Sequence, residues 1–107
     1  MANQYIQNLE DESFEESVQS GVTLVDFFTD WCGPCRMLAP VFEKVAEEMH
    51  QQLAFGKLDV DKGSATATKY RVTSVPTLIL FKEGKELWRE EGLRDAEMIK
   101  KMIARAL

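Results

Sequence analysis

The sequence predicts an α/β sandwich in which a mixed five-stranded sheet is flanked by four helices. Strand-like and helix-like segments alternate along the 107 residues, and the apolar run over residues 22–28 has the length of a central strand. A glycine-containing turn over 82–85 joins two further strands, which must therefore be antiparallel. Because 45% of the residues are hydrophobic, we expect one domain over 1–107 with its own core.

The first elements are short. Residues 5–9 predict a weak strand, and residues 11–18 predict a short helix. Ser13 and Glu16 have the spacing of a capping box, in which each side chain bonds a free backbone N–H of the first turn.

The central strand and the long helix come next. The run 22–28 is typical of a strand covered on both faces, yet it contains Asp26, which a buried strand should not contain. Apolar residues then recur at three- and four-residue spacing and predict an amphipathic helix over about 34–50. We predict a kink at Pro40, because proline removes a backbone donor inside a helix.

A second inner strand is predicted over residues 53–60. It is followed by a short helix that ends near Tyr70, with Asp61 or Ser64 as its cap. Residues 71–76 are typical of a loop.

The last part of the chain predicts a hairpin and a helix. Residues 77–81 and 86–90 are the two strands, and we interpret Trp88 in the second strand as a structural residue. The final helix spans about 95–106 with Asp95 as its N-cap.

The charge balance excludes several classes of partner. A net charge of -5 disfavours nucleic acid and anionic membrane surfaces, since both require a basic patch. No run approaches the ~20 apolar residues of a membrane span, and the first residues lack the basic and apolar regions of a signal peptide. We therefore expect a cytoplasmic protein.

The two cysteines of the chain, Cys32 and Cys35, stand on either side of Gly33 and Pro34. They follow a predicted strand and precede a predicted helix, and free backbone N–H groups at a helix N-terminus stabilise a thiolate. In a reducing compartment such a pair is typical of a redox-active or metal-binding site, rather than of a structural disulfide. Two inert core cysteines are the alternative interpretation.

An ordered set of residues makes the chain similar to the thioredoxin family over nearly its whole length. The set comprises Trp31-Cys32-Gly33-Pro34-Cys35, Ala39-Pro40, Asp26, Lys57, Val75-Pro76-Thr77 and Gly92. The resemblance implies the thioredoxin fold and an enzyme that reduces protein disulfides by dithiol–disulfide exchange.

The resemblance also implies roles for the reacting residues. Cys32, partly exposed at the helix N-terminus and with a lowered pKa, would attack the substrate disulfide, and the more buried Cys35 would resolve the mixed disulfide. Gly33 and Pro34 would tune the redox poise towards reduction. Asp26 would be the general base for Cys35, with Lys57 modulating its charge. A buried Asp–Lys pair that only joins two strands is the alternative.

A substrate-docking surface is implied as well, formed by Trp31, Val75, Pro76 and Gly92 with the Gly33-Pro34 turn. In the family this proline is cis and packs against the disulfide. Val75 would pair with an extended substrate through its backbone.

The partners and cofactors follow from the same resemblance. We expect a monomer that needs no bound cofactor and no metal, reduces disulfide-containing client proteins, and is itself reduced by thioredoxin reductase at the expense of NADPH. The chain departs from the common family pattern at Phe28, Arg36, Ser74 and Glu91. Ser74 and Glu91 border the expected docking surface, so they bear on partner choice.

Two other functions stay open. A dimer could bridge a metal through the cysteine pair, because C-x-x-C supplies two zinc ligands. The only histidine, His50, is poorly placed to add a third ligand. Alternatively, the folded surface could serve as a redox-independent partner of another protein.

Overall fold

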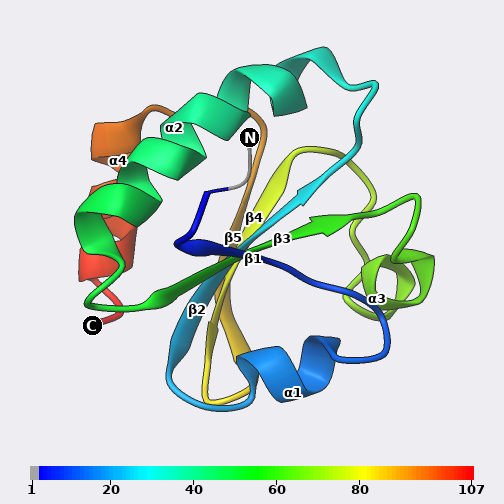
Figure 1. Ribbon diagram of the computed structural model, residues 1–107, viewed down its shortest axis with the longest axis horizontal. Coiled ribbons are helices and arrows are strands. Elements are labelled where there is room, and N and C mark those ends of the chain that lie inside the picture. The colour runs from blue at the N-terminus through cyan, green and yellow to red at the C-terminus, as the bar shows by residue number, and fades with distance from the viewer. Residues whose placement is uncertain (1–2) are drawn as a thin grey trace.

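The computed structural model describes residues 3–107, which form one five-stranded sheet with helices on both faces (Figure 1). The strand order is β1-β3-β2-β4-β5. The strands are β1 (Ile6–Asn8), β2 (Val22–Phe28), β3 (Ala54–Asp59), β4 (Thr77–Lys82) and β5 (Lys85–Glu91). β1 and β2 run parallel to β3, whereas β4 runs antiparallel to β2 and β5. The predicted mixed sheet is therefore confirmed.

Four helices cover the sheet, as predicted. They are α1 (Phe14–Val18), α2 (Gly33–Met49), α3 (Ser64–Lys69) and α4 (Ala96–Ala104). Figure 1 shows α2 and α4 on one face of the sheet, with α1 and α3 on the other. None of the helices described here is both long and apolar enough to cross a membrane.

Side chains of the central strand β2 alternate between two hydrophobic clusters. Leu24 belongs to the cluster that includes Leu38 of α2 and Ile99 of α4, whereas Val25 and Phe27 belong to the cluster beneath α1. Successive residues of a strand point to opposite faces, so Asp26 shares the face of Leu24. The sheet therefore directs this carboxyl towards α2.

The predicted capping box of α1 is wrong. Ser13 does occupy the N-cap, but its side chain makes no cap hydrogen bond within the described chain. Its backbone carbonyl instead accepts hydrogen bonds from the backbone N–H and the hydroxyl of Ser17. The helix is only five residues long, and its buried Phe14 and Val18 attach it to the core.

The predicted cap of α3 is also wrong. The N-cap is Gly63, and neither Asp61 nor Ser64 caps the helix. The carboxylate of Asp11 supplies the bonds: it accepts from the backbone N–H of Thr66 at 2.9 Å, from the Thr66 hydroxyl at 2.6 Å and from the backbone N–H of Ala65 at 3.4 Å. A residue more than fifty positions away thus replaces the local cap.

The remaining element predictions agree with the structure. Asp95 caps α4, accepting from the backbone N–H of Met98 at 2.8 Å. Trp88 is half-buried and packs against the core, as expected of a structural residue. α2 continues through Pro40, and the kink predicted there stays a prediction.

Candidate active site

The two cysteines lie where β2 leads into α2. Cys32 is the N-cap of α2 and forms a disulfide with Cys35, with 5.2 Å between the Cα atoms. The backbone N–H of Cys35 donates to the Cys32 Sγ at 3.1 Å. In the reduced protein this N–H and the helix dipole both favour a negative charge on Cys32.

The exposures of the two cysteines differ less than predicted. Cys32 is 7% exposed and Cys35 is 4% exposed. The order is the predicted one, but Cys32 is mostly buried in the disulfide form rather than partly exposed, because the chain folds over it at Val75. The Cys32 Sγ lies 3.7 Å from the Val75 carbonyl oxygen.

Asp26 is a buried carboxyl with an unpaired oxygen. It is 1% exposed, and its Oδ1 makes no hydrogen bond with any residue of 3–107. Burial raises the pKa of Asp26 to about 7, since the charged form loses its water, and the nearby Lys57 ammonium opposes this rise. A carboxyl with a pKa near neutrality can both accept and release a proton at physiological pH.

Lys57 lies beside Asp26 in the sheet. The two residues are register partners in the parallel pair β2–β3, so their side chains leave the same face. Lys57 is half-buried, and its Nζ lies 4.6 Å from the centre of the Phe28 ring. The structure thus brings this predicted residue to the carboxyl that it was expected to influence.

A cavity of about 180 Å³ joins the carboxyl to Cys35. Asp26, Lys57 and Cys35 all line it, so three predicted residues from β2, β3 and α2 meet in one place. It is also lined by Phe28, Thr29, Asp30, Arg36 and Ala39. Such a volume holds water, which takes about 30 Å³ per molecule in the liquid.

The predicted cis proline is present. The Val75-Pro76 peptide bond is cis, and the carbonyl of Pro76 accepts a hydrogen bond from the backbone N–H of Gly92 at 2.8 Å. This bond places Gly92 next to the proline. Pro76 is buried, and Val75 and Gly92 beside it are half-buried. The part of Pro76 in a docking surface stays a prediction.

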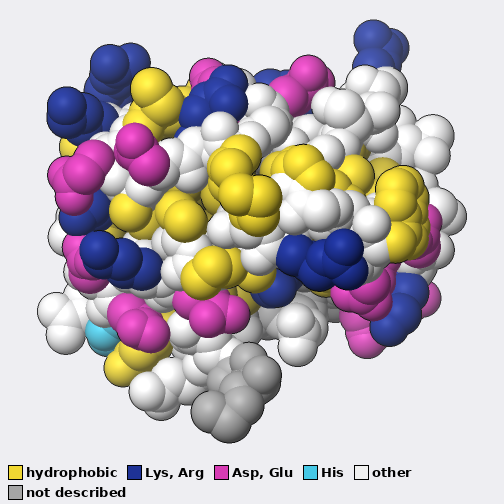
Figure 2. Space-filling view, turned by 90° about the horizontal axis from the view of Figure 1, so that it is seen from above, with side chains coloured by type: hydrophobic (Ala, Val, Ile, Leu, Met, Phe, Trp, Pro, Cys, Tyr) yellow, Lys and Arg dark blue, Asp and Glu magenta, His cyan; other side chains and the backbone are white. Residues whose placement is uncertain are grey.

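Trp31 is 70% exposed, which fits a docking role better than a core role. Its indole Nε1–H donates to the Asp61 carboxylate at 2.9 Å and fixes the ring. The sequence analysis missed this acceptor because it assigned Asp61 to a helix cap. Met37 on α2 is 61% exposed, and the sequence analysis did not name it as a candidate docking residue. Figure 2 shows the face over α2, where hydrophobic side chains lie between charged ones.

The structure separates His50 from the cysteines. Its ring stacks on Tyr5 with 3.9 Å between centroids, and it does not line the cavity at Cys35. Within residues 3–107, no group of three or more His, Cys, Asp or Glu side chains is placed to hold a metal ion.

Comparison with known proteins agrees with this geometry. The family model described as Thioredoxin matches residues 5–105. A thioredoxin of Chlamydia trachomatis is 45% identical over 100 residues, covering 94% of this chain and 97% of that protein. A thioredoxin of Chlamydia pneumoniae is 48% identical, with 86% and 89% covered, and one of Staphylococcus saprophyticus is 43% identical, with 91% and 93% covered. The chain therefore belongs to the thioredoxin family of thiol-disulfide oxidoreductases.

Proposed function

We propose that this protein reduces disulfides of client proteins with Cys32 as the attacking thiol, Cys35 as the resolving thiol and Asp26 as the proton acceptor. The observation that carries the proposal is the shared cavity: the Asp26 carboxyl, with its pKa of about 7, lines the same space as Cys35 and Lys57. The Oδ1 of this carboxyl has no hydrogen-bond partner in the described part of the chain.

The reaction consists of two exchanges. The Cys32 thiolate attacks one sulfur of the client disulfide, so that a mixed disulfide forms and the other client sulfur leaves as a thiolate. The Cys35 thiolate then attacks the Cys32 sulfur and releases the second client thiolate. The client sulfurs take up two protons, and two electrons have passed from the dithiol to the client. The product is the Cys32–Cys35 disulfide of this structure.

Asp26 serves the second exchange. Cys35 is buried, and burial disfavours a thiolate, so its proton needs an acceptor within the cavity. The ionised Asp26 carboxylate takes this proton through water. Lys57 keeps a fraction of the carboxyl ionised at neutral pH by lowering the pKa that burial raises.

Clients dock on the surface around Trp31, Met37, Val75 and Gly92. The Val75 carbonyl lies next to the Cys32 sulfur, so an extended client segment can pair with the Val75 backbone while its disulfide reaches that sulfur. The Gly33-Pro34 turn is exposed between the cysteines and allows the client to approach closely.

A thioredoxin reductase completes the cycle. It returns electrons from NADPH to the Cys32–Cys35 disulfide, so the chain itself needs no bound cofactor. We further propose that the protein acts as a monomer in the cytoplasm, where such a dithiol is kept reduced.

The test is reduction of insulin disulfides by the intact protein, driven by NADPH and a thioredoxin reductase. We expect continuous NADPH consumption that is lost in the Cys32→Ser, Cys35→Ser double variant. Intact, folded protein that fails to turn over would contradict the proposal.

The roles of the two thiols are tested by trapping. Cys35→Ser should accumulate mixed disulfides with clients through Cys32, because the resolving thiol is gone. Cys32→Ser is the matched control and should trap little, since its remaining thiol is buried. Stronger trapping through Cys35 would reverse the assignment.

A further inference from the structure

We propose that Phe28 is a positioning residue, whose ring holds the Lys57 ammonium beside Asp26 and away from the carboxylates of a second cavity that Lys57 also lines. This inference deepens the proposed function, because it concerns the group that controls the proton acceptor. Three observations support the inference: the register of β2 and β3, the contact between the Phe28 ring and the Lys57 ammonium, and the residues that line the cavity at Asp26 and the second cavity beside Lys57.

The sheet places the three side chains on one face. Asp26 and Phe28 are two residues apart on β2, and Lys57 lies opposite Asp26 on the parallel strand β3. Side chains two apart on a strand share a face, so Lys57 has Asp26 beside it and Phe28 on the diagonal. One lysine can therefore contact both.

The ring binds the ammonium directly. The Lys57 Nζ lies 4.6 Å from the centre of the Phe28 ring, within the distance at which a cation is attracted to an aromatic face. Within residues 3–107, Lys57 forms no salt bridge. The ring is thus the close partner that holds this charge.

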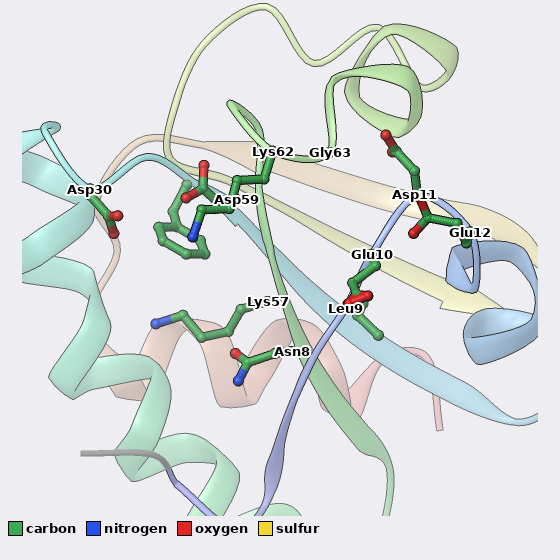
Figure 3. A pocket seen from close by; sticks show the side chains of 11 residues that line it. Asn8, Leu9, Glu10, Asp11, Glu12, Asp30, Lys57, Asp59, Lys62 and Gly63 are labelled. Carbon is green, nitrogen blue, oxygen red and sulfur yellow. The ribbon is translucent and has the colours of Figure 1, made fainter.

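A competing environment lies on the other side of Lys57. Figure 3 shows a cavity of about 510 Å³ that has Asp30 and Lys57 in its lining. This cavity shares Phe28, Asp30 and Lys57 with the smaller cavity at Asp26. Its other charged lining residues are Glu10, Asp11, Glu12, Asp59 and Lys62. Without the ring, the long and flexible lysine side chain is free to turn towards these carboxylates.

The position of the ammonium decides how strongly it acts on Asp26. Cys35 and Arg36 of α2, and Asp30 of the loop between β2 and α2, also line the cavity at Asp26. Only Lys57 among them is the register partner of the carboxyl. Coulomb attraction weakens with distance and with hydration, so a lysine that turns away leaves the carboxyl more protonated.

The experiment is an NMR titration of the Asp26 carboxyl carbon in the oxidised protein, in which the cysteines do not titrate. Phe28→Leu should raise the titration midpoint by about half a pH unit, which corresponds to a loss of about 0.7 kcal/mol of Coulomb attraction between the ammonium and the carboxylate. Phe28→Tyr and Phe28→Trp keep an aromatic face and should keep the midpoint near that of the parent.

The decisive control is the same substitution without the lysine. In a Lys57→Met background, Phe28→Leu should leave the midpoint unchanged. If Phe28→Leu shifts the midpoint equally in both backgrounds, Phe28 acts on Asp26 only through packing or hydration. If it shifts the midpoint in neither background, Phe28 does not influence Asp26. Either result overturns the proposal. Should Phe28→Leu fail to fold, Phe28→Met, of similar volume, replaces it in both backgrounds.

This titration involves no turnover, so it is independent of the insulin assay. A Lys57-dependent shift in a protein that fails to reduce insulin would overturn the proposed function alone. Normal insulin reduction without such a shift would overturn only the role of Phe28.

Discussion

Asp26 is costly to the fold because its carboxyl is buried and its Oδ1 finds no hydrogen-bond partner among residues 3–107. Its pKa is about 7 in the folded protein and close to 3.8 in the unfolded chain. Between these values the folded state holds a proton that the unfolded state has lost, so stability falls as the pH rises through this window. The loss is on the order of 4 kcal/mol above pH 7.

Asp26→Asn removes this titration and should therefore stabilise the oxidised protein. We expect little change at pH 4, where the native carboxyl is neutral, and a gain of several kcal/mol at pH 8. Urea unfolding at the two pH values measures the difference. Asp30→Asn is the control, since Asp30 lines the same cavity but is exposed and should show no such gain. An equal gain at both pH values would refute the ionisation argument.

The same substitution should slow catalysis. Without the carboxylate, the Cys35 proton loses its buried acceptor, and general-base catalysis typically contributes a factor of about 100 or more. The loss should be largest at pH 7 and above, where Asp26 is ionised. Stopped-flow reduction of a client disulfide across pH checks this, and an unchanged pH profile would leave Asp26 with a structural role.

At the scale of elements, α3 depends on a residue outside its own segment. The Asp11 carboxylate accepts hydrogen bonds at the start of this helix, and these bonds lower the pKa of Asp11. A lowered carboxyl pKa gives a stabilisation that is present above the unfolded pKa and is lost as the pH falls through the folded pKa.

Asp11→Ala should therefore lower the Tm by a few degrees at neutral pH, and by less under acidic conditions. The adjacent Glu12→Ala is the matched control, because Glu12 is exposed. Thermal unfolding followed by circular dichroism compares the two variants. Equal effects would show that the carboxylate of Asp11 does not support α3.

The elements themselves could be predicted from the sequence because periodicity and turn residues are local signals. The strand at 22–28 and the cap at Asp95 needed only neighbouring residues. The cap of α3 could not be found this way, because Asp11 and Thr66 meet only after the sheet has formed. Ser13 shows the converse: correct capping-box spacing without the side-chain bond.

At the scale of the whole molecule, the family resemblance named the residues of the candidate site but did not give the contacts between them. Asp26 is conspicuous in an apolar strand, whereas its pairing with Lys57 depends on the register of β2 and β3. The contact of Phe28 with Lys57, and the bond from Trp31 to Asp61, join separate segments. Such contacts have no local sequence signal.

The redox state should change the stability of the whole molecule. The Cys32–Cys35 disulfide closes a loop between residues only three apart in sequence. Constraining so short a loop in the unfolded chain stabilises the native state by about 2 kcal/mol. The folded and unfolded states of the oxidised and reduced protein form a thermodynamic cycle. Folding therefore favours formation of the disulfide by the same free energy. The folded dithiol is accordingly a stronger electron donor than the unfolded one, as a reductant requires.

Guanidinium unfolding with and without a reductant tests this coupling. The oxidised protein should unfold at a higher denaturant concentration than the reduced protein, by an amount corresponding to about 2 kcal/mol. The Cys32→Ser, Cys35→Ser variant is the control, and its midpoint should not respond to the reductant. Equal midpoints for the two redox states of the parent would mean that folding does not drive this dithiol towards oxidation.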